Sequence, residues 1–284
     1  MTCAWKELLA VLPTWVRKEV DIVGSEALQE LRLRINSPPE LILSEEILFL
    51  NRTISQEDLN YTVNAASRYS PWAAASSAKG FITAVGGHRI GLCGEAVVQQ
   101  GSVTSIKKIT SLCIRVAKSF PGIAAKAANL KGSILIIGAP GWGKTTLLRD
   151  FILQQKKAER ICVVDERQEL FPEELYHGAR VDVLSGCPKQ EGIPMLLRTM
   201  GPTCIAVDEI TDTRDALSLL QAANCGVRLL ATAHAASLSD FRQREVYHPL
   251  LENHVFDAFL VLKKDKTFTV ERMTEWTASG SVHY

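Results

Sequence analysis

This sequence of 284 residues has no apolar run that comes near the roughly 18 residues of a membrane-spanning helix. Its first residues also lack the charged start, apolar middle and small-residue cleavage site of a signal peptide. We therefore expect a cytoplasmic protein with no transmembrane segment of its own.

Paired cysteines are missing as well. The 7 cysteines are an odd number, and no two of them form a C-x-x-C pair. Disulfide frameworks and tetrahedral zinc sites usually show such regular spacing. We expect reduced thiols, and Cys113, Cys162 and Cys204 lie in apolar strand-like runs, where cysteine acts as a small hydrophobic residue.

The sequence has no excess of one charge and few aromatic residues. Its 32 Lys and Arg face 31 Asp and Glu, and aromatic residues make up 7%. Proteins that bind single-stranded nucleic acid need basic surface and stacking aromatics. We therefore expect no nucleic-acid partner, although a local basic patch is compatible with this balance. The length and the 46% hydrophobic content suffice for two domains with separate cores.

The most informative stretch that is present is GAPGWGKTT, residues 138–146, which matches G-x-x-x-x-G-K-[ST]. It follows an apolar run, 133–137, that reads as a buried strand, and it precedes an amphipathic stretch, 146–155, that reads as a helix. Glycines let successive main-chain N–H groups converge on phosphate oxygens at the positive end of the helix. The predicted nucleotide-binding residues are Gly138, Ala139, Pro140, Gly141, Trp142, Gly143, Lys144, Thr145 and Thr146.

A second apolar run, CIAVDEI, reads as a buried strand that ends in Asp208 and Glu209. In a fold with such a phosphate loop, Lys144 would reach the outer phosphates, and Thr145 and Asp208 would hold Mg²⁺. Glu209 would orient and deprotonate the attacking water. We therefore expect ATP with Mg²⁺ as the substrate and hydrolysis to ADP and phosphate as the reaction.

Two further strand ends carry candidate groups. ICVVDERQE places Asp165, Glu166 and Arg167 together, so Glu166 is a second candidate for the base, and spacing cannot settle the choice. We favour Glu209, and the alternative for the other segment is a solvated turn with an internal ion pair. His234 follows the apolar run RLLATA, at the end of a strand where open α/β sheets keep their ligands. It is either a γ-phosphate sensor or a structural histidine.

Transfer of a γ-phosphoryl group usually needs an arginine in addition to the loop lysine. Two candidates, Arg89 and Arg115, lie on predicted strands of the N-terminal part, from where they could reach a neighbouring subunit's site in trans. The others lie closer to the acidic strands along the chain, and they are Arg198 and Arg228.

Residues 1–118 read as a small α+β domain. Pro13 should separate two short helices, and Ser55 with Asp58 forms a capping box for a helix expected to run to Tyr69. Residues 81–85 and 89–98 read as two strands joined by a glycine turn, with further strand material at 103–117.

From residue 119 to 284, apolar strands alternate with helical stretches, which predicts an α/β domain with a mostly parallel sheet. The strands are SILII, ICVVD, CIAVD and VRLLATA, and AFLVLK with TFTVERM should form a late hairpin. The helical stretches are expected at about 140–156, 191–200, 213–225 and 239–252.

The ordered set GAPGWGKTT, VVDERQE, DVLSGCPKQEGIPMLLRTMGP, CIAVDEITD and ATAHA resembles the ATPases of type II and type IV secretion systems. Members of that superfamily carry a P-loop, an aspartate box, a Walker B strand and a histidine box in this order. RIGLCGEAV, VVDER and GCPKQEG, together with the P-loop, are similar to the stage III AA family of sporulation proteins.

This resemblance implies a RecA-like P-loop ATPase domain preceded by a smaller α+β domain, assembled as a homo-hexameric ring that hydrolyses ATP at subunit boundaries. It would work in the mother-cell cytoplasm or peripherally at the membrane, on the cytoplasmic face of a sporulation channel complex. By motif position, Glu166 falls in the aspartate box, Asp208 and Glu209 in Walker B, His234 in the histidine box and Arg198 before Walker B. The chain departs from many members, which have Gly-Glu at Walker B, a longer aspartate box and a tetracysteine metal module.

Two other functions remain open from the sequence. RecA-like domains also serve nucleic-acid-dependent ATPases, because a fold does not fix a function. The chain is also compatible with a nucleotide-binding scaffold that has little turnover.

Overall fold

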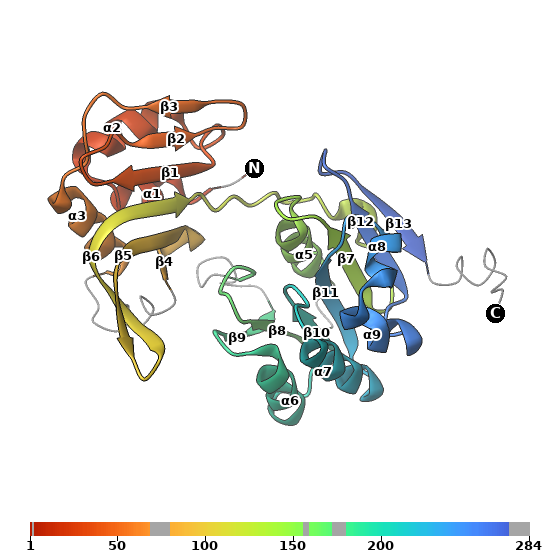
Figure 1. Cartoon of the computed structure of the whole chain (residues 1–284). Helices are drawn as coiled ribbons and strands as arrows, with labels where there is room; N and C mark the ends of the chain where they lie inside the picture. Colours follow the sequence, from red (N-terminus) through yellow and green to blue (C-terminus); the bar gives the residue numbers. More distant parts are fainter. Residues whose placement is uncertain (2, 69–79, 156–158, 172–179, 273–284) are drawn as a thin grey trace. The chain divides into compact units, whose positions relative to one another are not determined.

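The computed structural model describes residues 1, 3–68, 80–155, 159–171 and 180–272. The chain divides into two compact units. The first is Met1–Ser119, and the second takes in Phe120–Phe171 and the described residues from 180 onward. Each unit contains one of the two sheets (Figure 1) and has its own hydrophobic core.

The first unit is built on a six-stranded antiparallel sheet in the order β3-β2-β1-β6-β5-β4. Its strands are β1 (Glu30–Arg34), β2 (Glu40–Ile42), β3 (Ile47–Phe49), β4 (Phe81–Thr83), β5 (Arg89–Gln99) and β6 (Ser102–Arg115). The predicted glycine turn joins β4 to β5, where Gly86 has a φ of 81°. The antiparallel pairing of β4 with β5 confirms the predicted strand pair.

Three helices supply the rest of the first core: α1 (Trp5–Ala10), α2 (Thr14–Val23) and α3 (Gln56–Ala66). Pro13 separates α1 from α2 as predicted, because it occupies the position before the first turn of α2. The capping box is also confirmed, since the Ser55 hydroxyl accepts from the main-chain N–H of Asp58 and the Asp58 carboxylate accepts from that of Ser55. Helix α3 ends at Ala66, and Tyr69 lies outside the described residues.

The second unit contains a seven-stranded sheet in the order β13-β12-β7-β11-β10-β8-β9. Only β13 is antiparallel to its neighbour, so both the predicted parallel sheet and the predicted late hairpin are confirmed. The strands are β7 (Ile134–Gly138), β8 (Ile161–Asp165), β9 (Val181–Ser185), β10 (Cys204–Val207), β11 (Arg228–His234), β12 (Ala258–Leu262) and β13 (Phe268–Arg272). Edge strand β9 was not predicted, because its half-buried and exposed residues do not form an apolar run.

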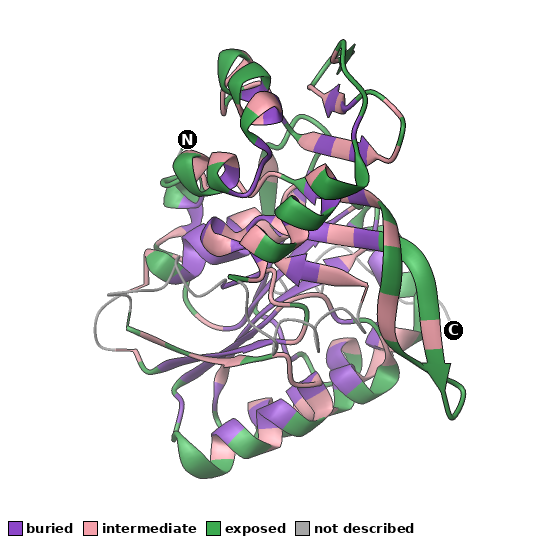
Figure 2. Ribbon diagram, turned by 90° about the vertical axis from the view of Figure 1, so that its left-hand side faces the viewer, coloured by how far each residue is buried: buried purple, intermediate pink, exposed green. Residues whose placement is uncertain are grey.

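Helices cover both faces of this sheet. Helix α5 (Lys144–Leu153) packs Leu147 and Phe151 on one face, in the core that includes Ile134 and Ile136. The other helices contribute to the core on the opposite face, and they are α6 (Lys189–Thr199), α7 (Thr213–Asn224), α8 (Leu238–Gln243) and α9 (His248–Glu252). Figure 2 shows the buried residues along the strands and on the inward sides of the helices.

The helix predicted over 239–252 is wrong as a single element. Helix α8 stops before Arg244, whose ψ of 117° is extended, and a 3₁₀ turn, η4 (Glu245–Tyr247), leads into α9. Pro249 stands at the start of α9, where it needs no helical N–H partner. The break lets the Tyr247 ring stack on Phe241, with centroids 4.3 Å apart.

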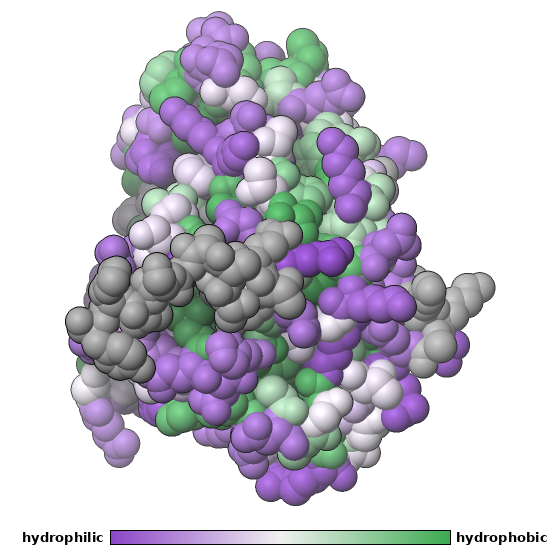
Figure 3. Space-filling view, turned by 90° about the vertical axis from the view of Figure 1, so that its right-hand side faces the viewer, coloured by the Kyte–Doolittle hydropathy of each residue, from purple (hydrophilic) through white to green (hydrophobic). Residues whose placement is uncertain are grey.

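Large exposed apolar side chains are spread over both units, among them Ile22, Phe49, Val98 and Leu217. On the face that Figure 3 displays, polar side chains are interspersed with apolar ones. Phe49 continues an exposed run with Ile47 and Leu48 on β3, whereas single exposed apolar residues such as Ile22 and Leu217 are normal on a protein surface. Among the residues that the structure describes, no helix combines the length and the hydropathy needed to span a membrane.

Helix α6 approaches β8 closely at Gly192. A Cβ atom at this position would lie 2.8 Å from Val164 Cγ1 and 3.1 Å from Leu184 Cδ2. We expect Gly192→Val to lower the free energy of unfolding by about 2 kcal/mol through overpacking, measured by urea denaturation. Met195→Val, on an exposed position of the same helix, should change it by less than about 0.5 kcal/mol. Equal midpoints for Gly192→Val and the unaltered chain would show that the helix can move away without loss.

Candidate functional site

The predicted phosphate loop connects the end of β7 to the start of α5. Gly141 and Gly143 have φ values of 75° and 100°, and no atom lies within 4 Å of a Cβ built at either position. The backbone conformation, and not lack of space, therefore requires glycine there. Gly138 is different, since a Cβ at this residue would lie 3.0 Å from Leu262 Cβ. No side chain among the described residues caps α5, which leaves the positive helix end available to an anion.

Lys144, the first residue of α5, is only 6% exposed. Its Nζ donates a hydrogen bond to the main-chain oxygen of Ala139 at 3.2 Å, across the loop. Burial lowers the pKa of Lys144 below its ordinary value, while Glu209 and Asp208 act in the opposite direction. The loop thus has one ammonium group at its centre, with two carboxylates close enough to influence it.

Thr145 and Asp208, the two residues predicted to hold Mg²⁺, lie together. The Thr145 hydroxyl donates to Asp208 at 3.2 Å, and the buried Thr232 hydroxyl donates to the same carboxylate oxygen at 3.2 Å. This contact arises because β11, which carries Thr232, lies between β7 and β10. A hydroxyl and a carboxylate are hard oxygen donors of the kind that Mg²⁺ takes alongside phosphate and water. The described residues include no cluster of three or more His, Cys, Asp or Glu side chains suited to a metal.

Glu209 and His234 also meet. His234 ends β11, and its backbone is the register partner of Gly138, the first residue of the loop. Its Nδ1 lies 3.0 Å from Oε1 of Glu209, and a guanidinium nitrogen of Arg167 lies 3.6 Å from Oε2. Burial and the charge of Lys144 lower the pKa of His234, and Glu209 raises it. A lowered pKa favours a neutral imidazole at pH 7.

The acidic residues after β8 have separate environments. Asp165 is fully buried, and its carboxylate accepts main-chain N–H groups of Glu169, Leu170 and Phe171 at 2.8–3.0 Å. Burial raises the pKa of Asp165, and the N–H donors counteract this effect. The alternative of a solvated turn is therefore wrong for Asp165. Its carboxylate instead holds the main chain of residues 169–171 in place after β8. Glu166 instead accepts a 2.6 Å hydrogen bond from Lys189.

The structure does not bring Arg198 or Arg228 to the phosphate loop of the same chain. Arg198 is exposed in the last turn of α6, just before the chain enters β10. It therefore lies at the amino-terminal ends of the parallel strands, opposite the phosphate loop. Arg228 begins β11 at that same end, where its guanidinium lies 3.3 Å from Glu159. Charge neutralisation by either side chain would therefore have to act on another copy of the chain.

Arg89 and Arg115 are directly opposed on β5 and β6 of the first unit. The Arg89 guanidinium lies 3.9 Å from the centroid of the Phe81 ring, and Arg115 Nε lies 3.6 Å from Glu30. The two arginines thus occupy opposed positions on one face of the sheet.

Sequence reasoning missed three buried polar residues near the site: Arg149, Lys189 and Thr232. Arg149 donates to the main-chain oxygens of Glu169 and Leu170 at 2.5 Å, so it holds the same turn that Asp165 holds. Thr232 and Lys189 lie within ATAHA and GCPKQEG. Those stretches supported the family resemblance, but their spacing alone gave these two residues no role.

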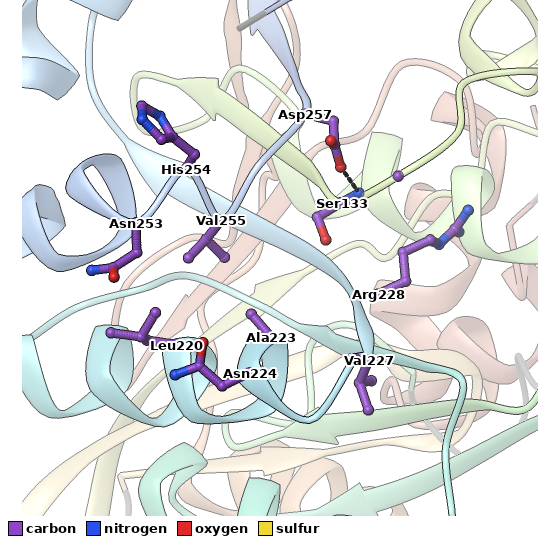
Figure 4. Close-up of a pocket in the computed structure, with 12 residues that line it drawn as sticks. Ser133, Leu220, Ala223, Asn224, Val227, Arg228, Asn253, His254, Val255 and Asp257 are labelled. Carbon is purple, nitrogen blue, oxygen red and sulfur yellow. Dashed lines mark hydrogen bonds between the residues drawn. The ribbon is translucent and has the colours of Figure 1, made fainter.

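A cavity of about 450 Å³ lies elsewhere in the second unit. Figure 4 shows Ser133 beside Asp257, whose carboxylate accepts the Ser133 N–H at 2.7 Å, with Arg228 near the same end. These residues lie where β7, β11 and β12 begin, at the edge opposite the phosphate loop. Of the predicted site residues only Arg228 lines it, so this cavity is separate from the predicted nucleotide site.

Comparison with known proteins places these features in a family context. A family model described as sporulation stage III, protein AA, matches residues 5–273. Stage III sporulation protein AA of Bacillus subtilis (strain 168) is 34% identical over 281 residues, which cover 92% of this chain and 91% of that protein.

Solved structures of an ATPase and of a pilus retraction motor have a similar architecture. The X-ray structure of the Legionella pneumophila ATPase DotB matches with a TM-score of 0.58 at 17% identity, covering 92% of this chain and 80% of that one. The crystal structure of the pilus retraction motor PilT with bound ADP matches with the same TM-score and identity, covering 87% and 76%. These likenesses confirm the predicted fold class, a RecA-like P-loop domain preceded by a smaller α+β domain.

Proposed function

The chain belongs to the family described as sporulation stage III, protein AA, and on this premise we propose that it is an ATPase that works as a ring motor. One observation carries the proposal. Lys144, the Thr145–Asp208 pair and the Glu209–His234 pair lie together at the carboxyl ends of the parallel strands of the second sheet. They supply a phosphate-binding cation, oxygen ligands for a metal ion and a carboxylate base, which are the parts that phosphoryl transfer to water requires.

ATP binding would use the main-chain N–H groups of the loop and of the first turn of α5. Lys144 would exchange the Ala139 carbonyl for an oxygen of the outer phosphates. Thr145 and Asp208 would hold Mg²⁺, which neutralises phosphate charge when bound. Thr232, whose hydroxyl donates to Asp208, fixes the orientation of that carboxylate.

Hydrolysis would use Glu209 as the general base. The water oxygen forms a bond to the γ-phosphorus, the bond to the β–γ bridging oxygen breaks, and a water proton passes to the Glu209 carboxylate. His234 and Arg167 flank the two oxygens of Glu209 and limit its rotation. Glu209 is favoured over Glu166 because it directly follows Asp208 and lies within electrostatic reach of Lys144, whereas Glu166 pairs with Lys189.

Arg167 lies beside Glu209 in the same chain, and a ring with sites at subunit boundaries would supply a further arginine for the γ-phosphate. Because Arg198 and Arg228 lie at the far edge of their own sheet, we propose that a neighbouring copy provides the cation, with Arg89 and Arg115 as the first candidates and Arg198 as the next. The ring would be a homo-hexamer in the mother-cell cytoplasm, docked on a sporulation channel complex at the membrane. No nucleic acid is needed in this scheme.

The ring proposal predicts that turnover per chain rises with protein concentration. Completed boundary sites need a neighbour, so dilution below the assembly range should lower turnover per chain. Light scattering with a non-hydrolysable ATP analogue should detect a species about six times the mass of one chain. Constant turnover from a monomer would contradict the ring, and a many-fold, salt-sensitive stimulation by single-stranded DNA or RNA would instead favour a nucleic-acid-dependent ATPase.

A further inference from the structure

The segment GCPKQEG, residues 186–192, brings the start of α6 to the end of β8. Gly186 has a φ of 71°, and its N–H donates to the main-chain oxygen of Asp165 at 2.9 Å. The Pro188 oxygen accepts from Gly192 N–H at 2.8 Å and so closes the first turn of α6. Gly192 then packs directly against Val164 of β8. The first residue of α6 therefore lies beside the residues that follow β8.

That first residue is Lys189, which is only 5% exposed. A cation in the first turn faces the positive end of its own helix, so the position is unfavourable without compensation. Two carboxylates compensate it, because Lys189 Nζ lies 2.6 Å from Glu166 Oε2 and 3.3 Å from Asp215 Oδ2. Lys189 thus connects the end of β8 to the start of α7.

Both carboxylates that Lys189 contacts are linked to the surroundings of Glu209. Asp215 Oδ2 accepts from the main-chain N–H and the hydroxyl of Thr211, at 3.0 and 2.9 Å, and Thr211 follows Glu209 by two residues. Glu166 directly precedes Arg167, whose guanidinium lies 3.6 Å from Glu209. One ammonium group therefore restrains both the loop that carries Glu209 and the loop that carries its cationic neighbour.

We infer that Lys189 is a positioning residue for Glu209, and that Glu166 serves as its counter-ion instead of as a second base. The inference rests on the proposed ATPase function and assigns the GCPKQEG segment a task within it. Without the ammonium group, Asp215 would keep a buried charge with no ion-pair partner among the described residues, and the loops bearing Arg167 and Glu209 would lose their common anchor. The carboxylate of Glu209 would then spend less time where it can accept the water proton.

Glu166 and Asp215 differ in their exposure to solvent, and this difference predicts which substitution lowers turnover more. The Glu166 side chain is 40% exposed, so water can replace a lost partner. Asp215 is 3% exposed, so water cannot readily do the same there. Removing Lys189 should therefore harm turnover more than removing the charge of Glu166.

The test measures kcat and ATP-analogue affinity for the full-length chain and four variants. Lys189→Met should lower kcat about 30-fold while the analogue affinity changes less than about 3-fold, since a small misplacement of a catalytic group is enough for such a loss. Lys189→Arg should recover part of kcat, and Glu166→Gln should lose less than about 5-fold. Glu191→Gln, which removes an exposed charge from the same first turn, should match the unaltered chain.

Each other result is decisive. A Lys189→Met chain with normal kcat would overturn the inference, and so would a parallel loss of kcat and analogue binding, which marks general misfolding of the site. If Lys189→Met does not fold, Glu166→Gln decides the matter, because a loss of about 100-fold or more would make Glu166 the base. Absence of turnover in the unaltered, well-folded chain would overturn the proposed function itself, and this inference with it.

Discussion

Replacing Lys144 with alanine should lower the affinity for Mg²⁺–ATP at least about 100-fold, which is about 2.7 kcal/mol. The ammonium group is buried and lies within electrostatic reach of Asp208 and Glu209. Without it, a triphosphate would meet two carboxylates with no loop cation between them. Isothermal titration calorimetry with a non-hydrolysable analogue measures the change directly.

The matched control is Lys131→Ala, which removes an exposed lysine shortly before β7 and should leave the affinity unchanged. A circular-dichroism melt checks that both variants remain folded. If Lys144→Ala bound the analogue as tightly as the unaltered chain does, the loop would not be a phosphate site, and the proposed function would fail with it.

Glu209→Gln should lower kcat by about 100-fold to 1000-fold and leave the analogue affinity nearly unchanged. The amide has the size of the carboxylate but cannot take the water proton. It can still contact His234 and Arg167, so the geometry of the site should persist. Single-turnover hydrolysis, with the enzyme in excess over ATP, separates this chemical step from product release.

The same variant distinguishes a motor from a scaffold. Complementation in sporulating cells should fail with Glu209→Gln if ATP hydrolysis does the work. A chain that binds ATP, does not hydrolyse it and still supports sporulation would establish the scaffold function. Glu245→Gln, an exposed acidic residue in η4, provides the control for loss of one charge.

Local patterns in the sequence predicted the parts of the structure that depend on local physics. The Ser55–Asp58 capping box, the glycine turn before β5 and the break at Pro13 follow from neighbouring residues, and the structure contains all three. Buried parallel strands are continuous apolar runs, so β7, β8, β10 and β11 were visible as well. The edge strand β9 was not, because it is only partly buried.

Contacts between distant segments could not be read from local patterns. Glu166 and Glu209 both follow apolar strands, and spacing gives them similar standing as candidates for the base. Their environments differ because β10 lies beside β11, which ends in His234, whereas β8 lies beside β9, and because α6 delivers Lys189 to Glu166 alone of the two. The position of Arg198 also depends on contacts between distant segments. The direction in which α6 crosses the sheet decides at which end of the strands its last turn lies.

The register of β7 against β11 has a mechanical consequence. Gly138 and His234 are paired on adjoining parallel strands, so the beginning of the loop and the backbone of His234 belong to one hydrogen-bonded ladder. If bound nucleotide displaces Gly138, the hydrogen-bonded peptide groups between the two strands would pass that displacement to His234. Side-chain substitution cannot remove those groups, so communication along this route should survive even in variants whose chemistry is lost.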